Sequence, residues 1–261
     1  MKFEIPLAPG AVTQFLLRVV VCLVVLSSLS LITLHLFPDA KLAYYFGKAF
    51  NLDVEKNIPT LYSCLALLFS SLLLGAIAYA KNLDSDRYKQ HWKILSFIFL
   101  FLSLDEAGQL HEKLIYPMRS LLNATGVLYF TWIVPMVFLV AIFLLSYTKF
   151  LFHLPVSIKK LFVAAAALYI GGGIGMELLG GYIASQTGEQ GLSYVIETTI
   201  EESLEMLGIV VFIHALISYI KTYLGGVSWN IYISGRNTQV TENQNIGIAA
   251  LSQSAQTSLL R

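Results

Sequence analysis

The hydrophobic and polar positions of the chain divide it into six apolar stretches, each of about twenty residues, the length that a transmembrane helix needs. The stretches cover approximately residues 15–37, 60–80, 92–112, 127–148, 160–183 and 200–223. In lipid the backbone must satisfy its own hydrogen bonds, so segments of this kind are helical. The pattern predicts an all-α polytopic integral membrane protein, a bundle of six transmembrane helices.

The composition agrees with that pattern. Hydrophobic residues make up 56% of the 261 residues and charged residues only 13%, whereas a soluble domain carries about 25% charged residues. The mean hydropathy is +0.69. We therefore expect the lipid bilayer as a partner, with a lipid-phase small molecule or a cation as the ligand, and no nucleic acid.

The positions of the basic residues predict the orientation. Five of the 17 Lys and Arg residues fall on one side of the predicted membrane, and the other twelve fall on the opposite side, which holds both ends of the chain. The five are Lys41, Lys48, Lys56, Lys113 and Arg119. By the positive-inside rule, both termini are cytoplasmic.

The segments between and after the spans give the domain organisation. We expect one transmembrane domain over residues 1–233, followed by a polar, disordered cytoplasmic tail over 234–261, which has too little apolar content to pack. In the outer loop over 38–59, the sequence KLAYYFGKAF is typical of a short amphipathic helix at the membrane interface.

Acidic residues recur in the outer halves of three predicted spans. At 1.5 Å per residue, Asp105 and Glu106 lie about 20 Å from the cytoplasmic end of their helix, Glu177 about 25 Å and Glu205 about 27 Å. The same arithmetic places His111 and Glu112 near the outer surface, and it places Glu201 and Glu202 one turn above Glu205. Three helices therefore bring ionisable groups to one level of the membrane.

An ionisable residue inside a membrane is a functional-site hypothesis by default. We take Asp105, Glu106 and Glu205 as candidate catalytic residues. The candidate metal ligands are Asp105, Glu106, His111, Glu112, Glu177, Glu201, Glu202 and Glu205. Carboxylates that meet in a medium of low dielectric constant must share protons or bind cations. The competing interpretation is a structural hydrogen-bond network, and for Glu201 and Glu202 it is simple stabilisation by the helix dipole.

The expected cofactor is a divalent metal ion: Fe, Mn, Ca or Zn. Because carboxylates far outnumber imidazoles here, oxygen-preferring metals or redox-active iron and manganese fit better than zinc. The Glu-x-x-His pairs of di-iron bundles do not occur in this sequence. The spacing therefore leaves the identity of the metal open.

Glycines accompany the acids. The sequence GGGIGMELLGG surrounds Glu177, and in it Gly171 and Gly175 form a small-xxx-small pair that favours close helix packing. Gly108 lies between Glu106 and His111, where it is expected to loosen the helix.

Three functions are consistent with these features. The first is a metal-binding membrane enzyme, an oxidoreductase or hydrolase that acts on a lipid-phase or outer-side substrate. The second is a cation or proton transporter, and the third is a structural or assembly subunit of a membrane complex. The inner halves of the spans contain serines such as Ser70 and Ser146 but no carboxylate. A pocket closed on the inner side favours catalysis over a path through the membrane.

Overall fold

The structure is a computed structural model that describes residues 8–224, apart from the side chains of Glu112, Leu114 and Tyr116. All secondary structure in this range is helical, as the apolar pattern predicts. The range belongs to one compact unit, Pro6–Val227. The predicted tail over 234–261 lies outside the described residues.

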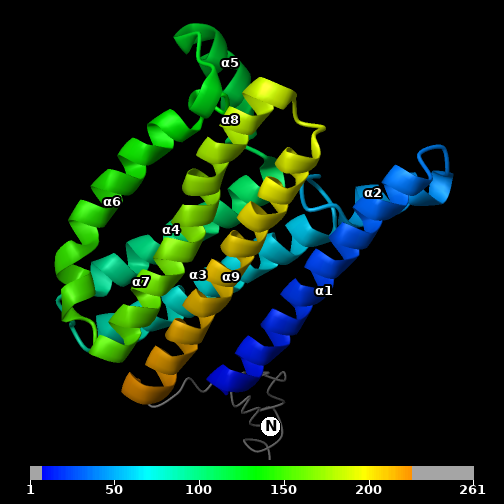
Figure 1. Cartoon of the computed structure of the whole chain (residues 1–261). Helices are drawn as coiled ribbons and strands as arrows, with labels where there is room; N and C mark the ends of the chain where they lie inside the picture. Colours follow the sequence, from blue (N-terminus) through cyan, green and yellow to red (C-terminus); the bar gives the residue numbers. More distant parts are fainter. Residues whose placement is uncertain (1–7, 225–261) are drawn as a thin grey trace, which may run out of the picture. The chain divides into compact units, whose positions relative to one another are not determined.

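Long helices alternate in direction along this unit (Figure 1). They are α1 (Pro9–Leu36), α3 (Ile58–Leu83), α4 (Lys89–Gly108), α6 (Ile133–His153), α7 (Val156–Ile170) and α9 (Leu192–Tyr223). Helix α7 continues through a π-helical turn, η2 (Gly171–Met176), into α8 (Glu177–Thr187). The short elements are α2 (Lys41–Phe50), α5 (Glu112–Leu122) and η1 (Gly126–Leu128). The expected short helix over the sequence KLAYYFGKAF is confirmed by α2.

Five of these helical segments are long and apolar enough to cross a membrane among the described residues: α1, α3, α6, the continuous segment Val156–Thr187, and α9. The remaining predicted span, the third one over residues 92–112, corresponds to α4, which does not meet the same criterion. Its sequence begins with KQHWK and ends with LDEAG, so charged residues occupy both ends and shorten its apolar part.

Two predicted boundaries are wrong. The third span was expected to reach residue 112, but α4 ends at Gly108, and Gln109 adopts the left-handed conformation with φ of 53°. The chain then starts a separate helix, α5, in what was expected to be a loop. The sixth span was expected from residue 200, but α9 begins at Leu192. Ser193, Glu197, Thr198 and Thr199 interrupt the apolar pattern in its first two turns.

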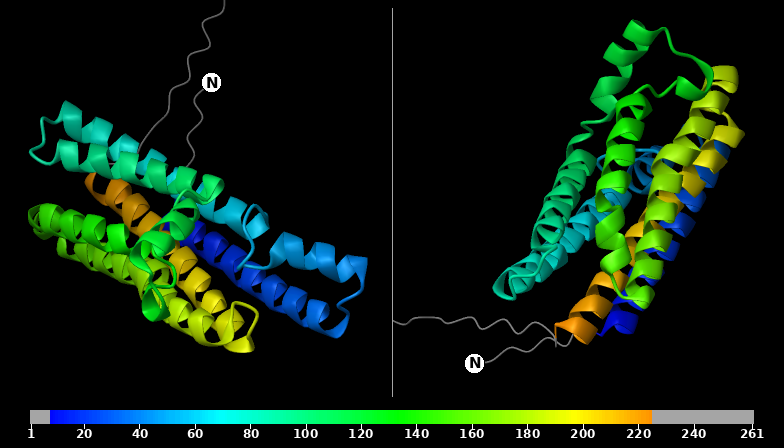
Figure 2. Two further views of the ribbon diagram at one scale, coloured as in Figure 1. Left: turned by 90° about the horizontal axis from the view of Figure 1, so that it is seen from above. Right: turned by 90° about the vertical axis from the view of Figure 1, so that its left-hand side faces the viewer.

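Helix α9 is the centre of the unit. It lies between the α3–α4 pair and α7 (Figure 2), and it buries residues along most of its length. Its closest approach is to α7 at Gly208, where a Cβ atom would lie 2.8 Å from the backbone nitrogen of Tyr169. It also contacts α1, where the Thr13 hydroxyl lies 2.7 Å from Nδ1 of His214.

Helices α3 and α4 form an antiparallel pair held by reciprocal hydrogen bonds between small side chains and backbone carbonyls. The Ser71 hydroxyl donates to the Ser96 carbonyl, and the Ser96 hydroxyl donates to the Ser71 carbonyl, both at 2.8 Å. Two turns away, the Ser103 hydroxyl donates to the Cys64 carbonyl at 2.9 Å. Small polar side chains that hydrogen-bond across a helix pair are typical of membrane proteins.

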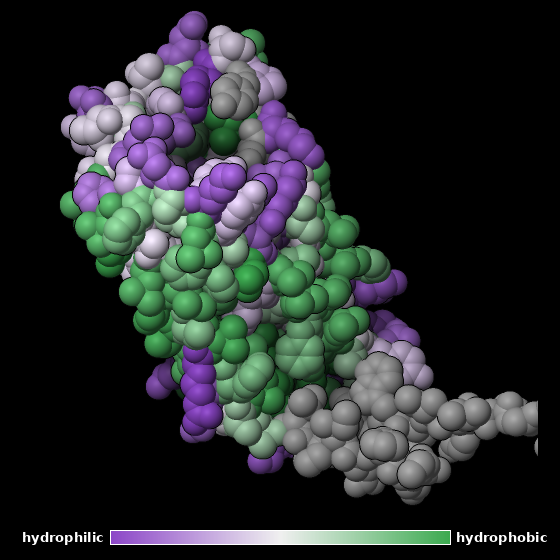
Figure 3. Space-filling view, turned by 90° about the vertical axis from the view of Figure 1, so that its right-hand side faces the viewer, coloured by the Kyte–Doolittle hydropathy of each residue, from purple (hydrophilic) through white to green (hydrophobic). Residues whose placement is uncertain are grey.

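The surface of the unit is strongly apolar. Large hydrophobic side chains are exposed along α1 and α6, among them Val21, Phe138 and Leu145 at 62%, 68% and 79%. Figure 3 shows a hydrophobic middle region on one face of the unit, with hydrophilic side chains gathered toward the end that carries α5. A soluble monomer rarely exposes such large contiguous apolar patches.

Candidate functional site

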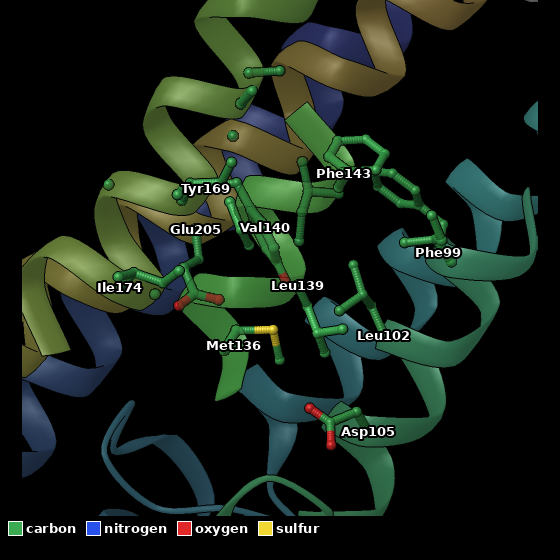
Figure 4. Close-up of a pocket in the computed structure, with 18 of the residues that line it drawn as sticks. Phe99, Leu102, Asp105, Met136, Leu139, Val140, Phe143, Tyr169, Ile174 and Glu205 are labelled. Atoms are coloured by element: carbon green, nitrogen blue, oxygen red, sulfur yellow. The ribbon is translucent and has the colours of Figure 1, made fainter. Parts of the chain in front are cut away.

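A cavity of about 1340 Å³ lies among α4, α6, α7 with η2, and α9. Along most of its length the lining is apolar. Phe99 and Leu102 contribute from α4, and Leu139, Val140 and Phe143 contribute from α6 (Figure 4). Buried residues of α6 lie only near its two ends, at Ile133 and Phe150. The middle of α6 is therefore a single-helix wall on one side of the cavity.

The other end of the cavity is acidic. Its lining includes eight carboxylic acids: Asp53, Glu55, Asp105, Glu106, Glu177, Glu201, Glu202 and Glu205. None of the described residues that line the cavity is a lysine or an arginine. Figure 4 shows Asp105 and Glu205 extending into the cavity from α4 and α9. The cavity thus combines an apolar body with one strongly acidic end.

Asp105 holds His111 in a fixed orientation. The backbone N–H of His111 donates to Oδ1 of Asp105 at 2.9 Å, and Nδ1 of His111 lies 2.8 Å from Oδ2. In the tautomer with the proton on Nδ1, the imidazole donates this bond to the carboxylate and leaves Nε2 as an acceptor. This contact exists because α4 ends at Gly108 and the chain turns at Gln109, which adopts the left-handed conformation. On a regular helix, residues six apart would point in different directions.

Trp132 connects the histidine to α8. Its indole ring packs against the imidazole of His111, with ring centroids 4.8 Å apart. Its Nε1–H donates to Oε1 of Glu177 at 3.0 Å. The segment that carries Trp132 is attached to α5, because Arg119 Nε donates to the Tyr129 carbonyl at 2.8 Å and the Thr131 hydroxyl donates to the Ile115 carbonyl at 2.8 Å.

The π-helical turn η2 provides the surface on which Glu205 lies. A Cβ atom at Gly172 would come within 2.9 Å of Glu205 Cγ and 3.0 Å of the Glu201 carbonyl oxygen. At Gly173 it would come within 2.6 Å of Glu205 Oε1. Short π-helical segments inside α-helices often occur at functional sites. Here the turn lets the backbone of η2 contact a carboxylate side chain directly.

The prediction that Gly171 and Gly175 pack closely against a neighbouring helix is wrong, because a Cβ atom at either position would meet nothing within 4 Å. The glycines that approach α9 are instead Gly172, Gly173 and Gly180. The wider π-helical turn changes which residues share a face, and a regular helical spacing cannot show this.

Three carboxyl groups form a row between α8 and α9. Glu201 is within electrostatic range of Glu177 on α8 and of Glu197, which lies one turn earlier on α9. Glu197 is only 3% exposed, and its oxygens receive no hydrogen bond from a donor among the described residues. Its carboxyl group rests against Gly180 of α8, where a Cβ atom would collide with it. Carboxyl groups this close must share protons or have a cation between them.

The structure brings most of the predicted site residues to this one cavity. Its lining contains Asp105, Glu106, His111, Glu177, Glu201, Glu202 and Glu205. The side chain of Glu112, the remaining candidate ligand, lies outside the described residues. As the described side chains are placed, no three His, Cys, Asp or Glu residues are close enough to hold a metal ion. The metal and catalytic roles therefore stay predictions.

Four functional candidates were missed by the sequence interpretation. Glu197 shares the face of Glu201 and Glu205, at a spacing of four residues, so extending the sixth span by one turn would have included it. Asp53 and Glu55 come from the outer loop, and Trp132 comes from the segment before α6. Their positions depend on loop packing, for which the sequence carries no spacing signal.

The fold and the cavity define an all-helical protein with five membrane-length apolar helices among the described residues and a cavity with one acid-lined end. The chain belongs to a protein family described as a domain of unknown function, DUF8692, whose model matches residues 16–220. No curated protein and no solved structure matches the chain.

Proposed function

We propose that the chain is an integral membrane hydrolase that acts on an amphipathic substrate taken from the lipid phase. The observation that carries this proposal is the cavity, because an apolar chamber that ends in an oriented histidine and several carboxyl groups matches a molecule with an apolar tail and a polar head. Pockets for drug-sized ligands have volumes of about 300–1,000 Å³, and this one, at about 1340 Å³, has room for a long tail.

In this proposal the membrane is crossed six times. Helix α4 is the additional span beside the five long apolar helices, because its hydrogen bonds to α3 at Ser96 and Ser103 align it with a helix of membrane length. Both termini are cytoplasmic by the distribution of Lys and Arg. The end with α2, α5 and the start of α9 then faces outward, and the acidic end of the cavity lies in the outer half of the membrane.

The proposed chemistry uses His111 as the general base. With the proton on Nδ1 held by Asp105, the second ring nitrogen, Nε2, takes the proton from an attacking water molecule. The water oxygen bonds to the carbonyl carbon of an ester or amide in the substrate head. The proton then passes to the leaving oxygen or nitrogen as its bond to that carbon breaks. Glu205 is within electrostatic range of His111, so its carboxylate is placed to stabilise the protonated imidazole.

A divalent metal ion is the proposed cofactor, and it would activate the water in place of the base: with Nε2 of His111 bound to the ion, the ion itself would lower the pKa of the water. A histidine that binds a metal commonly donates its other ring N–H to a carboxylate, which is the arrangement of His111 and Asp105. His111, Glu106 and Glu205 are the donors that would receive the ion. Their side chains would have to rotate toward one another, because no three described ligands are close enough in the structure. Asp105 would then orient a ligand rather than serve as one.

The test is turnover of lipids by the purified protein. The full chain is reconstituted with a total lipid extract, and mass spectrometry follows which lipids decrease and which products appear. The matched control is His111→Ala, which removes the base and leaves the apolar cavity. The proposal requires that the wild-type protein consumes a lipid that the variant leaves intact. Identical lipid profiles for the two proteins, with and without added divalent metal, would overturn it.

A further inference from the structure

The acidic end of the cavity has two parts. One is the reaction centre proposed above, around His111, Asp105 and Glu205. The other is the row Glu177–Glu201–Glu197 between α8 and α9, of which Glu177 and Glu201 line the cavity. The proposed chemistry gives this row no role. This second part is called the α8–α9 row below.

Aromatic rings lie beside the α8–α9 row. The Trp132 indole donates to Glu177 at 3.0 Å. Tyr194 is one turn before Glu197 on α9 and packs against Phe130, with ring centroids 6.4 Å apart. Trp132, Tyr194 and Phe130 all line the cavity, as do Glu177 and Glu201. The combination of carboxylates with aromatic rings is the chemistry that proteins use to bind ammonium groups, since a cation within about 6 Å of a ring centroid is attracted to its face.

The carboxyl groups of the row favour the binding of a positively charged group. Glu197 is 3% exposed and accepts no hydrogen bond from a described donor, while its neighbour is another carboxyl group. The described lining of the cavity contributes no Lys or Arg to offset these acids. An ammonium group beside Glu201 would neutralise one carboxylate, and protons shared along the row would account for the others.

We propose that the α8–α9 row, with Trp132 and Tyr194, binds the ammonium group of an amphipathic amine, whose tail occupies the apolar part of the same cavity. This inference rests on the proposed function and names its substrate class. The head of the molecule lies at Glu177 and Glu201, and its tail follows Leu139, Val140 and Phe143 of α6. A bond near the head is then within reach of the His111 centre.

The test compares probes that share one tail. Binding of radiolabelled dodecyltrimethylammonium to the purified full chain is measured in a nonionic detergent, and unlabelled dodecyltrimethylammonium, dodecanol, dodecanoate and tetramethylammonium are used as competitors. We expect only the amphipathic cation to compete at low concentration. Competition by dodecanol at the same concentration would overturn the inference. Competition by tetramethylammonium at the same concentration would show a site for soluble amines and would equally contradict a lipid-phase substrate.

The matched variants are Glu201→Gln, in the row, and Glu189→Gln, an exposed acid in the segment between α8 and α9. Glu201→Gln should weaken dodecyltrimethylammonium binding at least tenfold, while Glu189→Gln should bind as the wild type does. If Glu201→Gln does not fold, Trp132→Leu should lose binding and Trp132→Phe, which keeps an aromatic ring, should retain most of it. Wild-type affinity in folded Glu201→Gln, or in folded Trp132→Leu, would show that the row only holds α8 and α9 together.

The two proposals fail in different ways. The hydrolase is tested by lipid turnover and this inference by ammonium binding, so each can fail without the other. Ammonium binding without any lipid turnover would leave this inference standing and refute the hydrolase. Turnover of a lipid that carries no amine would support the hydrolase and refute this inference.

Discussion

Asp105 and His111 are joined by two hydrogen bonds, from the backbone N–H of His111 at 2.9 Å and from its Nδ1 at 2.8 Å. The first bond supports the turn of the chain after Gly108, and the second holds the imidazole ring in one orientation. One carboxylate therefore both shapes the α4–α5 connection and orients the proposed base. The side chains are only 14% and 23% exposed for Asp105 and His111, so water competes weakly for these bonds.

Replacing Asp105 should separate these two effects. Asp105→Ala removes both acceptors, and we expect it to lower the free energy of unfolding by about 2–4 kcal/mol, since a hydrogen bond to a charged group contributes roughly 1.5–3 kcal/mol. Asp105→Asn keeps one acceptor oxygen and should lose less stability, yet it should lose turnover, because an amide does not hold the imidazole in the same way. Unfolding titrations in mixed micelles measure the first effect, with the exposed acid change Asp84→Ala as the control. An Asp105→Ala protein as stable as the wild type would contradict the described contact.

The glycines of η2 allow a matched pair of substitutions. Gly172→Ala places a methyl group 3.0 Å from the Glu201 carbonyl oxygen, so the helices must shift, and a loss of about 1–3 kcal/mol is expected for such overpacking. Gly175→Ala meets nothing within 4 Å and should be neutral or stabilising by up to about 1 kcal/mol, because alanine favours helix. Thermal unfolding of both variants gives the comparison. Equal melting temperatures would show that η2 does not pack on α9 as described.

The spacing of residues predicted part of this arrangement. The apolar runs gave the positions of the long helices, and a rise of 1.5 Å per residue placed Glu177 and Glu205 at similar depth, where both line the cavity. The turn after Gly108 was anticipated only as a loosening of the helix. Its consequence, the contact of His111 with Asp105, needs the actual backbone conformation at Gln109.

Other features depend on tertiary packing. The start of α9 at Leu192 was missed because polar residues interrupt the apolar pattern there, among them Glu197, which is buried and lies against Gly180 of α8. The pair Gly171 and Gly175 was chosen on regular helical spacing, and the π-helical turn moves the contact to Gly172 and Gly173. Regular spacing predicts which residues share a helix face only where the helix keeps one turn geometry, and the π-helical turn changes that geometry.

The proposed orientation predicts which residues can be reached from outside the cell. In a background with Cys22→Ser and Cys64→Ser, a membrane-impermeant thiol reagent should label Ser120→Cys in intact cells and leave Ser85→Cys unlabelled until the membrane is opened. Both serines are exposed in the structure, in α5 and after α3. The reverse labelling pattern would place the acidic end of the cavity on the cytoplasmic side.

The proposed metal ion makes a separate prediction about stability. A divalent ion that binds only the folded protein stabilises it by mass action, by about 2.7 kcal/mol at a hundredfold excess over its dissociation constant. A chelator should therefore lower the melting temperature of the wild-type protein, and Glu205→Gln should purify with less metal and respond less to the chelator. Protein without stoichiometric metal, whose melting ignores the chelator and rises in Glu205→Gln, would favour carboxyl groups that share protons, as in a proton transporter.

The most direct test of a lipid-phase substrate is to fill the apolar part of the cavity and leave its acidic end unchanged. Val140→Trp adds bulk to the cavity wall, whereas Leu145→Trp adds the same bulk to a side chain of α6 that is 79% exposed. In the lipid-extract assay, Val140→Trp should lose turnover while it keeps a normal melting temperature, and Leu145→Trp should turn over lipid as the wild type does. Full lipid turnover by a folded Val140→Trp protein would contradict a substrate tail bound in this cavity.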